Sequence, residues 1–250
     1  MPASLPDLSL SESTLSEGAA APMAAAHLPA SEQAQEQSPE SVPGAAEEAV
    51  SAEAAPARKR PRPGERRVQI LQTLAGMLEQ PGADRVTTAA LAAKLSVSEA
   101  ALYRHFASKA QMFEGLIEFI EGSIFTLLNQ IVEREGSGQA QAQKIVAVLM
   151  QFGERNPGMT RVMVGDALVY ENERLVARMN QFFDRIESTL RQVLRNAAEA
   201  RGSATPTVEA NAQASVLLSF MIGRLQRYAR SGFKRLPTEQ LEFSLKLLVA

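Results

Sequence analysis

The sequence predicts an all-α protein with two helical domains preceded by a disordered arm. Across residues 64–250, apolar residues recur at steps of three and four, which is the spacing of one helix face. No segment there alternates apolar and polar residues over the length of a strand, so we expect nine helices and no sheet. Residues 1–63 hold nine of the thirteen prolines and no aromatic residue, too little apolar material to offset the entropy of ordering. We therefore divide the chain into an arm (1–63), a small domain (64–107) and a larger domain (108–250).

The small domain is expected to contain three helices. The first spans about 65–80 and ends before Pro81. Its expected apolar face consists of Val68, Leu71, Leu74, Ala75 and Leu78. Thr87 or Thr88 can cap a second helix to about residue 95, and Ser98 can cap a third to about residue 105. A tight turn at Ser96-Val97 joins the second and third helices.

The larger domain is expected to contain six helices. Ser108 followed by Gln111 indicates a capping box ahead of a long apolar-faced helix that stops at the loop 135–138. A helix over about 139–155 follows, and Asn156-Pro157 then supplies a capping residue with proline at the first helical position. Further helices are expected over about 159–169, 172–200, 207–230 and 238–249. The last two carry apolar residues suited to a two-fold, four-helix interface with a second copy: Val216, Leu217, Phe220, Met221, Leu225, Leu241, Leu245 and Leu248.

The composition argues against several kinds of site. The chain has no cysteine, and its two histidines, His27 and His105, are too few for a multi-histidine metal site, so we expect no metal or other cofactor. No nucleotide-binding glycine motif is present, and no apolar run approaches the ~18–20 residues that cross a bilayer. The first residues lack the basic start and apolar core of a signal peptide, so we expect a cytoplasmic protein that does not enter a membrane.

An enzymatic function finds little support in the sequence. Glu118 and Glu121 share a helix face, but no histidine, cysteine or lysine converges on them in sequence. We interpret them as an exposed acidic face, and we expect that the protein is not an enzyme.

Charge is distributed unevenly along the chain, although the formal net charge is only −2. Residues 1–57 contain nine acidic residues and no Lys or Arg, whereas residues 58–109 contain ten Lys or Arg against four acidic residues. A localised basic block of this kind predicts a polyanionic partner. The acidic arm can be a solubilising tail or a competitor of DNA for the basic block, and a start codon assigned too far upstream would also explain it.

Two short helices joined by a tight turn, next to a basic segment, are typical of a helix-turn-helix motif that binds double-stranded DNA. Its expected core consists of Leu91, Leu95, Val97, Leu102 and Phe106. The residues expected to face base edges are Ser98, Glu99, Ala100 and Tyr103. Those expected to contact phosphates are Arg66, Arg67, Thr87, Thr88, His105 and Lys109. An ordinary helical hairpin with a solvated face is the alternative interpretation.

Residues 98–106 (Ser-Glu-Ala-Ala-Leu-Tyr-Arg-His-Phe), followed by Ser108-Lys109 and a long helix, resemble the TetR family of dimeric regulators. The strings Leu-Ile-Glu-Phe-Ile-Glu (116–121) and Phe-Gly-Glu-Arg-Asn-Pro-Gly (152–158) are similar to those of the nucleoid occlusion factors within that family. The resemblance covers roughly residues 66–245. It implies a nucleoid-associated homodimer that binds specific, palindromic chromosomal sites and, when bound to DNA, antagonises the tubulin-like division protein FtsZ.

The same resemblance implies a groove between the fourth and fifth helices that binds the C-terminal tail of FtsZ. The residues here that match the groove are Phe119, Val148, Gln151, Arg155 and Asn156. Leu127 and Gln151 replace the Arg and Gly that are more usual there, and Ser96 stands where a turn glycine is common.

The groove residues have structural interpretations as well. Arg155 has the donor geometry to bind a carboxylate of an acidic segment, but a cation at a helix C-terminus also offsets the helix dipole. Phe119 can be an ordinary core residue. At the level of the whole protein, one rival function is a ligand-released transcriptional repressor whose body encloses an apolar pocket. A weaker rival is a helical scaffold that does not bind DNA.

Overall fold

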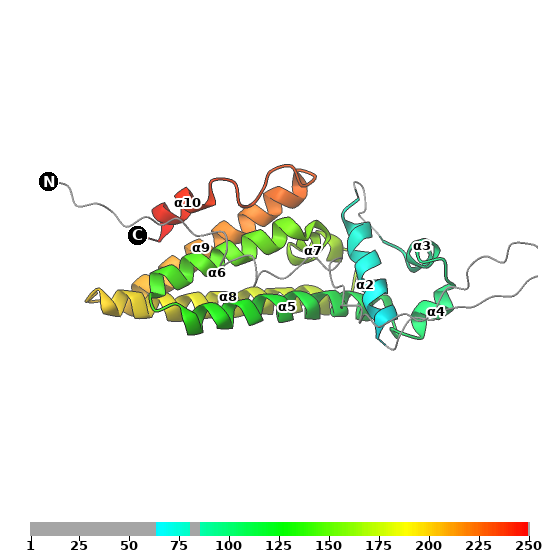
Figure 1. Cartoon of the computed structure of the whole chain (residues 1–250), viewed down its shortest axis with the longest axis horizontal. Coiled ribbons are helices and arrows are strands. Elements are labelled where there is room, and N and C mark those ends of the chain that lie inside the picture. The colour runs from blue at the N-terminus through cyan, green and yellow to red at the C-terminus, as the bar shows by residue number, and fades with distance from the viewer. Residues whose placement is uncertain (1–63, 81–85, 250) are drawn as a thin grey trace, which may run out of the picture.

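A computed structural model describes residues 64–80 and 86–249, and within them it contains nine α-helices, one 3-10 helix and no strand. The all-α prediction is therefore confirmed for these residues, whereas the arm and Pro81, before which the first helix was expected to end, lie outside them. Three helices, α2 (Glu65–Leu78), α3 (Thr88–Lys94) and α4 (Glu99–Tyr103), lie together at one end of the molecule (Figure 1).

The remaining elements form the body of the molecule. They are α5 (Lys109–Arg134), α6 (Gly138–Arg155), α7 (Pro157–Met163), η2 (Asp166–Leu168), α8 (Glu173–Ala200), α9 (Pro206–Arg230) and α10 (Leu241–Leu248). Figure 1 shows α5, α6, α8 and α9 running along the long axis. Their apolar faces meet in one continuous core that extends into the three-helix end through α2.

The core of the three-helix end differs from the prediction at the start of α2. Ile70, Leu74 and Leu78 are buried, but Val68 is exposed. At about 100° per residue, Val68 lies about a third of a turn away from the direction of these three side chains, so it faces solvent. The predicted core residues Leu91, Leu102 and Phe106 are buried, and Leu95 and Val97 pack partly buried against them.

The caps of the two short helices are those predicted. Thr87 Oγ1 accepts a hydrogen bond from the amide of Ala90 (3.1 Å), and Ser98 Oγ accepts one from the amide of Ala101 (3.3 Å). Between them, Ser96 has a φ of 54°, the left-handed conformation that costs a residue with a side chain more than a glycine. The tight turn of the motif is therefore formed without glycine.

Three local predictions in the body were wrong in detail. The helix expected over 159–169 begins at Pro157 and ends at Met163, because Gly165 takes a left-handed φ of 85° and a short 3-10 helix follows. Asn156 does not cap α7 with its side chain; its Nδ2 atom instead donates to the carbonyl of Phe152 at 2.9 Å. The capping box of α5 is only half formed. The Ser108 hydroxyl accepts from the amide of Gln111 as predicted, but Gln111 Oε1 accepts from the amide of Ala107 (2.8 Å) and not from that of Ser108.

The apolar residues expected at a dimer interface divide into three groups by burial. Five of them lie in the core of the single chain: Leu217, Met221, Leu225, Leu241 and Leu245. Phe220 and Leu248 are partly buried, and Val216 is exposed. On α10 the exposed apolar side chains are instead Phe243 (67% exposed) and Leu247 (70% exposed), one turn apart.

Of the described helices, α5 alone is long and apolar enough to cross a membrane by length and composition. It is also a central helix of the bundle, because Ile117, Ile120 and Ile124 are fully buried against neighbouring helices. The same apolar composition is what a core helix requires.

Candidate DNA-binding and partner-binding sites

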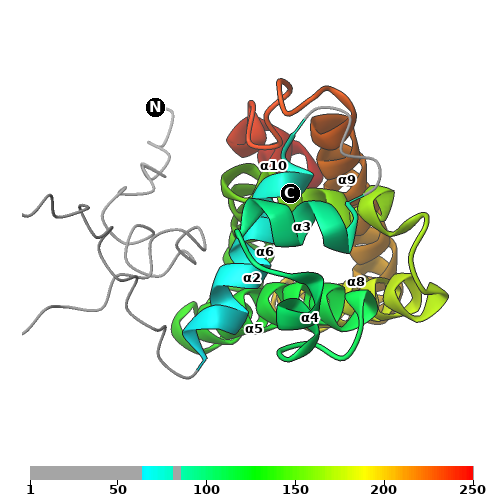
Figure 2. The same cartoon turned by 90° about the vertical axis from the view of Figure 1, so that its right-hand side faces the viewer.

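The outer surface of α4 carries the residues expected to read bases. Ser98, Glu99, Ala100 and Tyr103 are all exposed, and His105 is exposed just beyond the helix. Figure 2 shows α3 and α4 at the surface of this end of the molecule, with the body behind them. The structure thus brings the predicted base-contacting residues together on one accessible element.

Thr87 and Thr88, which were predicted to contact phosphates, form hydrogen bonds that position α3 and α4. The Thr87 hydroxyl is used as a helix cap, and the Thr88 hydroxyl donates to Glu99 Oε2 at 2.6 Å. This second bond joins the first turn of α3 to the first turn of α4. Both side chains therefore help to fix the angle between the two helices of the motif.

Each predicted phosphate-binding cation also has a partner within the chain. Arg66 Nη1 donates to Gln69 Oε1 (2.7 Å). Arg67 donates to the carbonyl of His105 and lies over the Phe106 ring, with its Cζ atom 4.1 Å from the ring centroid. Arg67 thereby ties α2 to the end of α4, a contact across 38 residues that local sequence patterns do not reveal.

Lys109, the first residue of α5, forms an ion pair with Glu171, which lies between η2 and α8. Sequence reasoning also passed over Lys94 and Arg104, which are exposed at the ends of α3 and α4. Their sequence positions could have indicated phosphate contacts, since both are basic residues within the helix-turn-helix segment itself.

The groove expected between α5 and α6 is only partly accessible. Arg155 is exposed at the end of α6, and Phe119 and Gln151 are half-buried. Val148 and Asn156, by contrast, are buried, because Val148 belongs to the core and Asn156 is hydrogen-bonded to the end of α6. Their predicted contact with a partner is not supported by this arrangement.

The end of α6 is held by α9 and by the segment before α10. The Tyr228 hydroxyl on α9 donates to the carbonyl of Glu154 at 3.0 Å, and Thr238 donates to the Glu154 carboxylate. Burial raises the pKa of Tyr228, and the negative charges of Glu154 and Glu79 act in the same direction. The neighbouring Arg155 therefore projects from a fixed backbone.

The acidic residues of α5 face arginines of α8. Arg178 binds Glu121 (2.7 Å) and approaches Glu118 (3.6 Å), and Arg174 binds Glu114 (2.9 Å). The hydrogen bond to Glu121 raises the pKa of Arg178. The interpretation of Glu118 and Glu121 as a solvated acidic face is therefore wrong for Glu121, whose charge is used to join α5 to α8.

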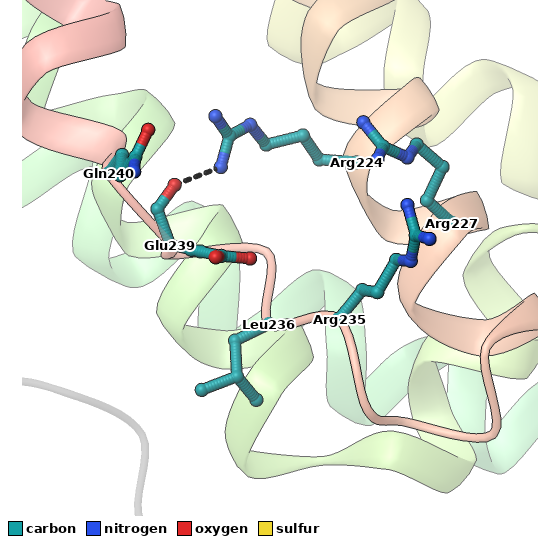
Figure 3. A pocket seen from close by; sticks show the side chains of 6 residues that line it. All are labelled: Arg224, Arg227, Arg235, Leu236, Glu239 and Gln240. Carbon is teal, nitrogen blue, oxygen red and sulfur yellow. Dashed lines mark hydrogen bonds between the residues drawn. The ribbon is translucent and has the colours of Figure 1, made fainter.

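A separate cavity of about 240 Å³ lies where α9 connects to α10 (Figure 3). It is lined by Arg224, Arg227, Arg235, Leu236, Glu239 and Gln240. Arg224 donates to the carbonyls of Pro237 (3.1 Å) and Glu239 and to Ser244 Oγ (2.9 Å), so it holds the turn that leads into α10. Burial and the nearby charge of Arg227 lower the pKa of Arg224. Among the described residues, no group of three acidic or histidine side chains could hold a metal ion.

Comparison with known families matches both parts of the chain. Residues 70–116 match the family described as "Bacterial regulatory proteins, tetR family". Residues 138–250 match the SlmA-like "Tetracyclin repressor-like, C-terminal domain".

Individual relatives cover nearly all of the described chain. The "Nucleoid occlusion factor SlmA" of Photobacterium profundum is 51% identical over 186 residues, which are 74% of this chain and 94% of that protein. The protein of the same name from Idiomarina loihiensis is 52% identical over 174 residues, 70% of this chain and 88% of that protein. Both relatives are named as nucleoid occlusion factors.

Among solved structures, the TetR family transcriptional regulator PfmR from Thermus thermophilus superposes with a TM-score of 0.60 at 19% identity, covering 73% of this chain and 95% of that chain. The fatty acid degradation regulator FadR from Bacillus halodurans gives 0.62 at 12% identity, with coverage of 75% and 96%. These structural similarities show the TetR fold. The two relatives whose sequences are about half identical to this chain show which family of TetR-type proteins it belongs to. The chain belongs to the SlmA family of nucleoid occlusion factors, which are DNA-binding proteins of the TetR type.

Proposed function

We propose that this protein binds specific chromosomal DNA sites as a homodimer and, while bound, antagonises the assembly of FtsZ over the nucleoid. One observation carries the proposal: the chain is about half identical to nucleoid occlusion factors over 174–186 residues, and a SlmA-like family model matches the body over residues 138–250. A match to the TetR DNA-binding domain alone would support only a regulator of unknown target. The model that matches the body is SlmA-like, so the similarity to nucleoid occlusion factors extends beyond the DNA-binding domain.

The geometry of α4 supports the DNA-binding half of the proposal. Tyr103 and Ala100 are exposed on one short helix, and two exposed basic residues, Lys94 and Arg104, stand at the ends of α3 and α4. Base edges in the major groove accept a helix of this kind, and the cations at its border suit the phosphates on either side.

The exposed apolar side chains of α9 and α10 support the homodimer. Phe243 and Leu247 lie one turn apart on α10 with most of their surface in water, and Val216 is exposed on α9. Exposed apolar groups on adjacent helices are typical of a surface that a second copy covers. A two-fold interface through α9 and α10 would remove them from water.

The proposed binding surface for the FtsZ tail consists of the accessible groove residues Arg155, Phe119 and Gln151. A guanidinium group can bind a carboxylate through two parallel hydrogen bonds, and the half-buried ring of Phe119 on α5 offers apolar contact. The surface is therefore suited to a short acidic segment that also carries apolar residues.

Sedimentation of FtsZ polymer tests the proposal directly. Addition of this protein together with duplex DNA that contains its binding site should reduce the polymer pelleted with GTP, and addition without DNA should reduce it much less. A ligand-released repressor would leave the pellet unchanged and would release DNA when its small-molecule ligand is added. An unchanged pellet with bound DNA present would reject FtsZ antagonism.

A further inference from the structure

The body of the molecule holds the lysine at the start of α5 through one acidic residue. The Lys109 Nζ atom forms an ion pair with Glu171, 62 residues later in the chain. Only 9% of the Glu171 side chain is exposed and only 23% of the Lys109 side chain. The pair is therefore largely shielded from water, which makes the attraction between the two charges stronger than at an open surface.

The two partners depend on the ion pair unequally. Among the described residues, Lys109 is the one group that forms a hydrogen bond or ion pair with the Glu171 side chain. A carboxylate held away from water is costly without a cation, so Glu171 resists the loss of Lys109. The lysine is less constrained, because its long side chain can carry the ammonium group to another anion.

Lys109 also stands where a DNA phosphate is expected. It is the first residue of α5, directly after the helix-turn-helix segment, and the Ser108 hydroxyl caps the amide of Gln111. The amino end of a helix of 26 residues attracts anions through its exposed amides and its dipole. In the structure, the anion bound to Lys109 at this place is the Glu171 carboxylate.

We propose that Glu171 competes with DNA phosphate for Lys109 and thereby lowers the affinity of the protein for DNA. This inference rests on the proposed binding of DNA at this end of the molecule. Phosphate contacts carry no base information, so the competition lowers the affinity for every duplex and leaves the preference between sequences unchanged. It also links DNA to the body, because the segment that leads into α8 loses its anchor when Lys109 turns to a phosphate.

Equilibrium binding of the full chain to a labelled mixed-sequence duplex, repeated over a range of salt concentrations, tests the proposal. Glu171→Gln removes the competing charge and nearly preserves the size of the side chain. The variant should bind about three- to tenfold more tightly, and its plot of log affinity against log salt should steepen by up to about 0.9, because Glu171 keeps Lys109 from the phosphate in part of the wild-type complexes.

Two further variants separate the ion pair from net charge. Glu173→Gln removes the same charge from an exposed residue in the first turn of α8, and it should change affinity by less than about twofold. In a Lys109→Met background, adding Glu171→Gln should produce no further gain. Circular dichroism checks the folding of Lys109→Met, and if that variant unfolds, the salt slope of Glu171→Gln decides the question.

Equal affinity of the wild type and Glu171→Gln would overturn the proposal. Weaker binding by Glu171→Gln would overturn it as well, because Glu171 would then position Lys109 toward DNA. An equal gain in Glu173→Gln would reduce the effect to net charge and likewise reject the role of the ion pair. If the wild type itself binds no duplex, the proposed function fails, whereas wild-type binding with an unchanged Glu171→Gln variant rejects only this inference.

Discussion

A methyl group added at Gly158 should weaken the junction between the DNA-binding end and the body. Gly158 lies in the first turn of α7, where an added Cβ atom would stand 2.1 Å from the carbonyl oxygen of Ala75 on α2 and 3.2 Å from Glu79 Cγ. The nearest atom belongs to the backbone, so it cannot rotate away, and α2 and α7 must separate. Overpacking of this kind costs up to about 3 kcal/mol, and a backbone clash belongs at that upper end. Gly158→Ala should therefore lower the melting temperature by about 6–12 °C, at about 2–4 °C per kcal/mol for a domain of this size.

Thermal unfolding followed by circular dichroism measures this change, and the chain offers a matched control. Gly122 is an exposed residue of α5, and no atom lies within 4 Å of a Cβ atom built there. Gly122→Ala should stabilise the protein by up to about 1 kcal/mol, because alanine favours the helix. If Gly158→Ala melts at or above the temperature of the wild type, α2 and α7 do not approach as closely as described, and the reasoning fails.

Three further changes test the partner surface, the dimer interface and the pH dependence. Arg155→Asp should leave DNA affinity within about twofold and weaken binding of the FtsZ tail by about 2–4 kcal/mol, measured by anisotropy with a labelled tail peptide; full inhibition of FtsZ assembly by this variant would reject the groove. Phe243→Ser with Leu247→Ser should convert the dimer to a monomer in light scattering and weaken DNA binding, and a dimer that survives would place the interface elsewhere. Burial raises the pKa of Tyr228 above its ordinary value of 10.0, so its stabilising effect is complete at lower pH and is lost as pH rises through the folded-state pKa. Tyr228→Phe should lose the bond to Glu154 at neutral pH and reduce the loss of stability above about pH 10, as urea unfolding would show.

Features set by neighbouring residues were predictable from the sequence. The helix-turn-helix segment and its caps at Thr87 and Ser98 follow from short-range rules, and the structure confirms them. The end of α7 was missed because apolar spacing continues past Gly165, and only the left-handed backbone there shows where the helix stops. Asn156 was assigned to the following helix because proline comes next, whereas its amide bonds back to the preceding one.

The candidate sites were harder to predict, because burial and long-range partners within the chain decide which side chains remain free to contact DNA or another protein. Val148 fits a groove residue by resemblance, yet its side chain belongs to the core. Lys109 and Arg67 are basic residues in the expected places, but their partners lie 62 and 38 residues away in the chain. No local pattern connects a lysine at the start of one helix with a glutamate in a distant loop, so the competition for that lysine could be inferred only from the structure.

The attachment of Glu154 to Tyr228 and Thr238 has a consequence for mixed populations of subunits. These two residues belong to α9 and to the segment before α10, the part of the chain that carries the exposed apolar groups. In the proposed dimer, an FtsZ tail seated at Arg155 would therefore rest on a surface whose support is shared with the proposed interface through α9 and α10. When wild-type and Arg155→Asp subunits are produced in equal amounts in one cell and pair at random, about half of the wild-type surfaces are paired with a defective one. If both tail surfaces of a dimer must be occupied, division inhibition should fall with the square of the wild-type fraction, so an altered allele would be partly dominant.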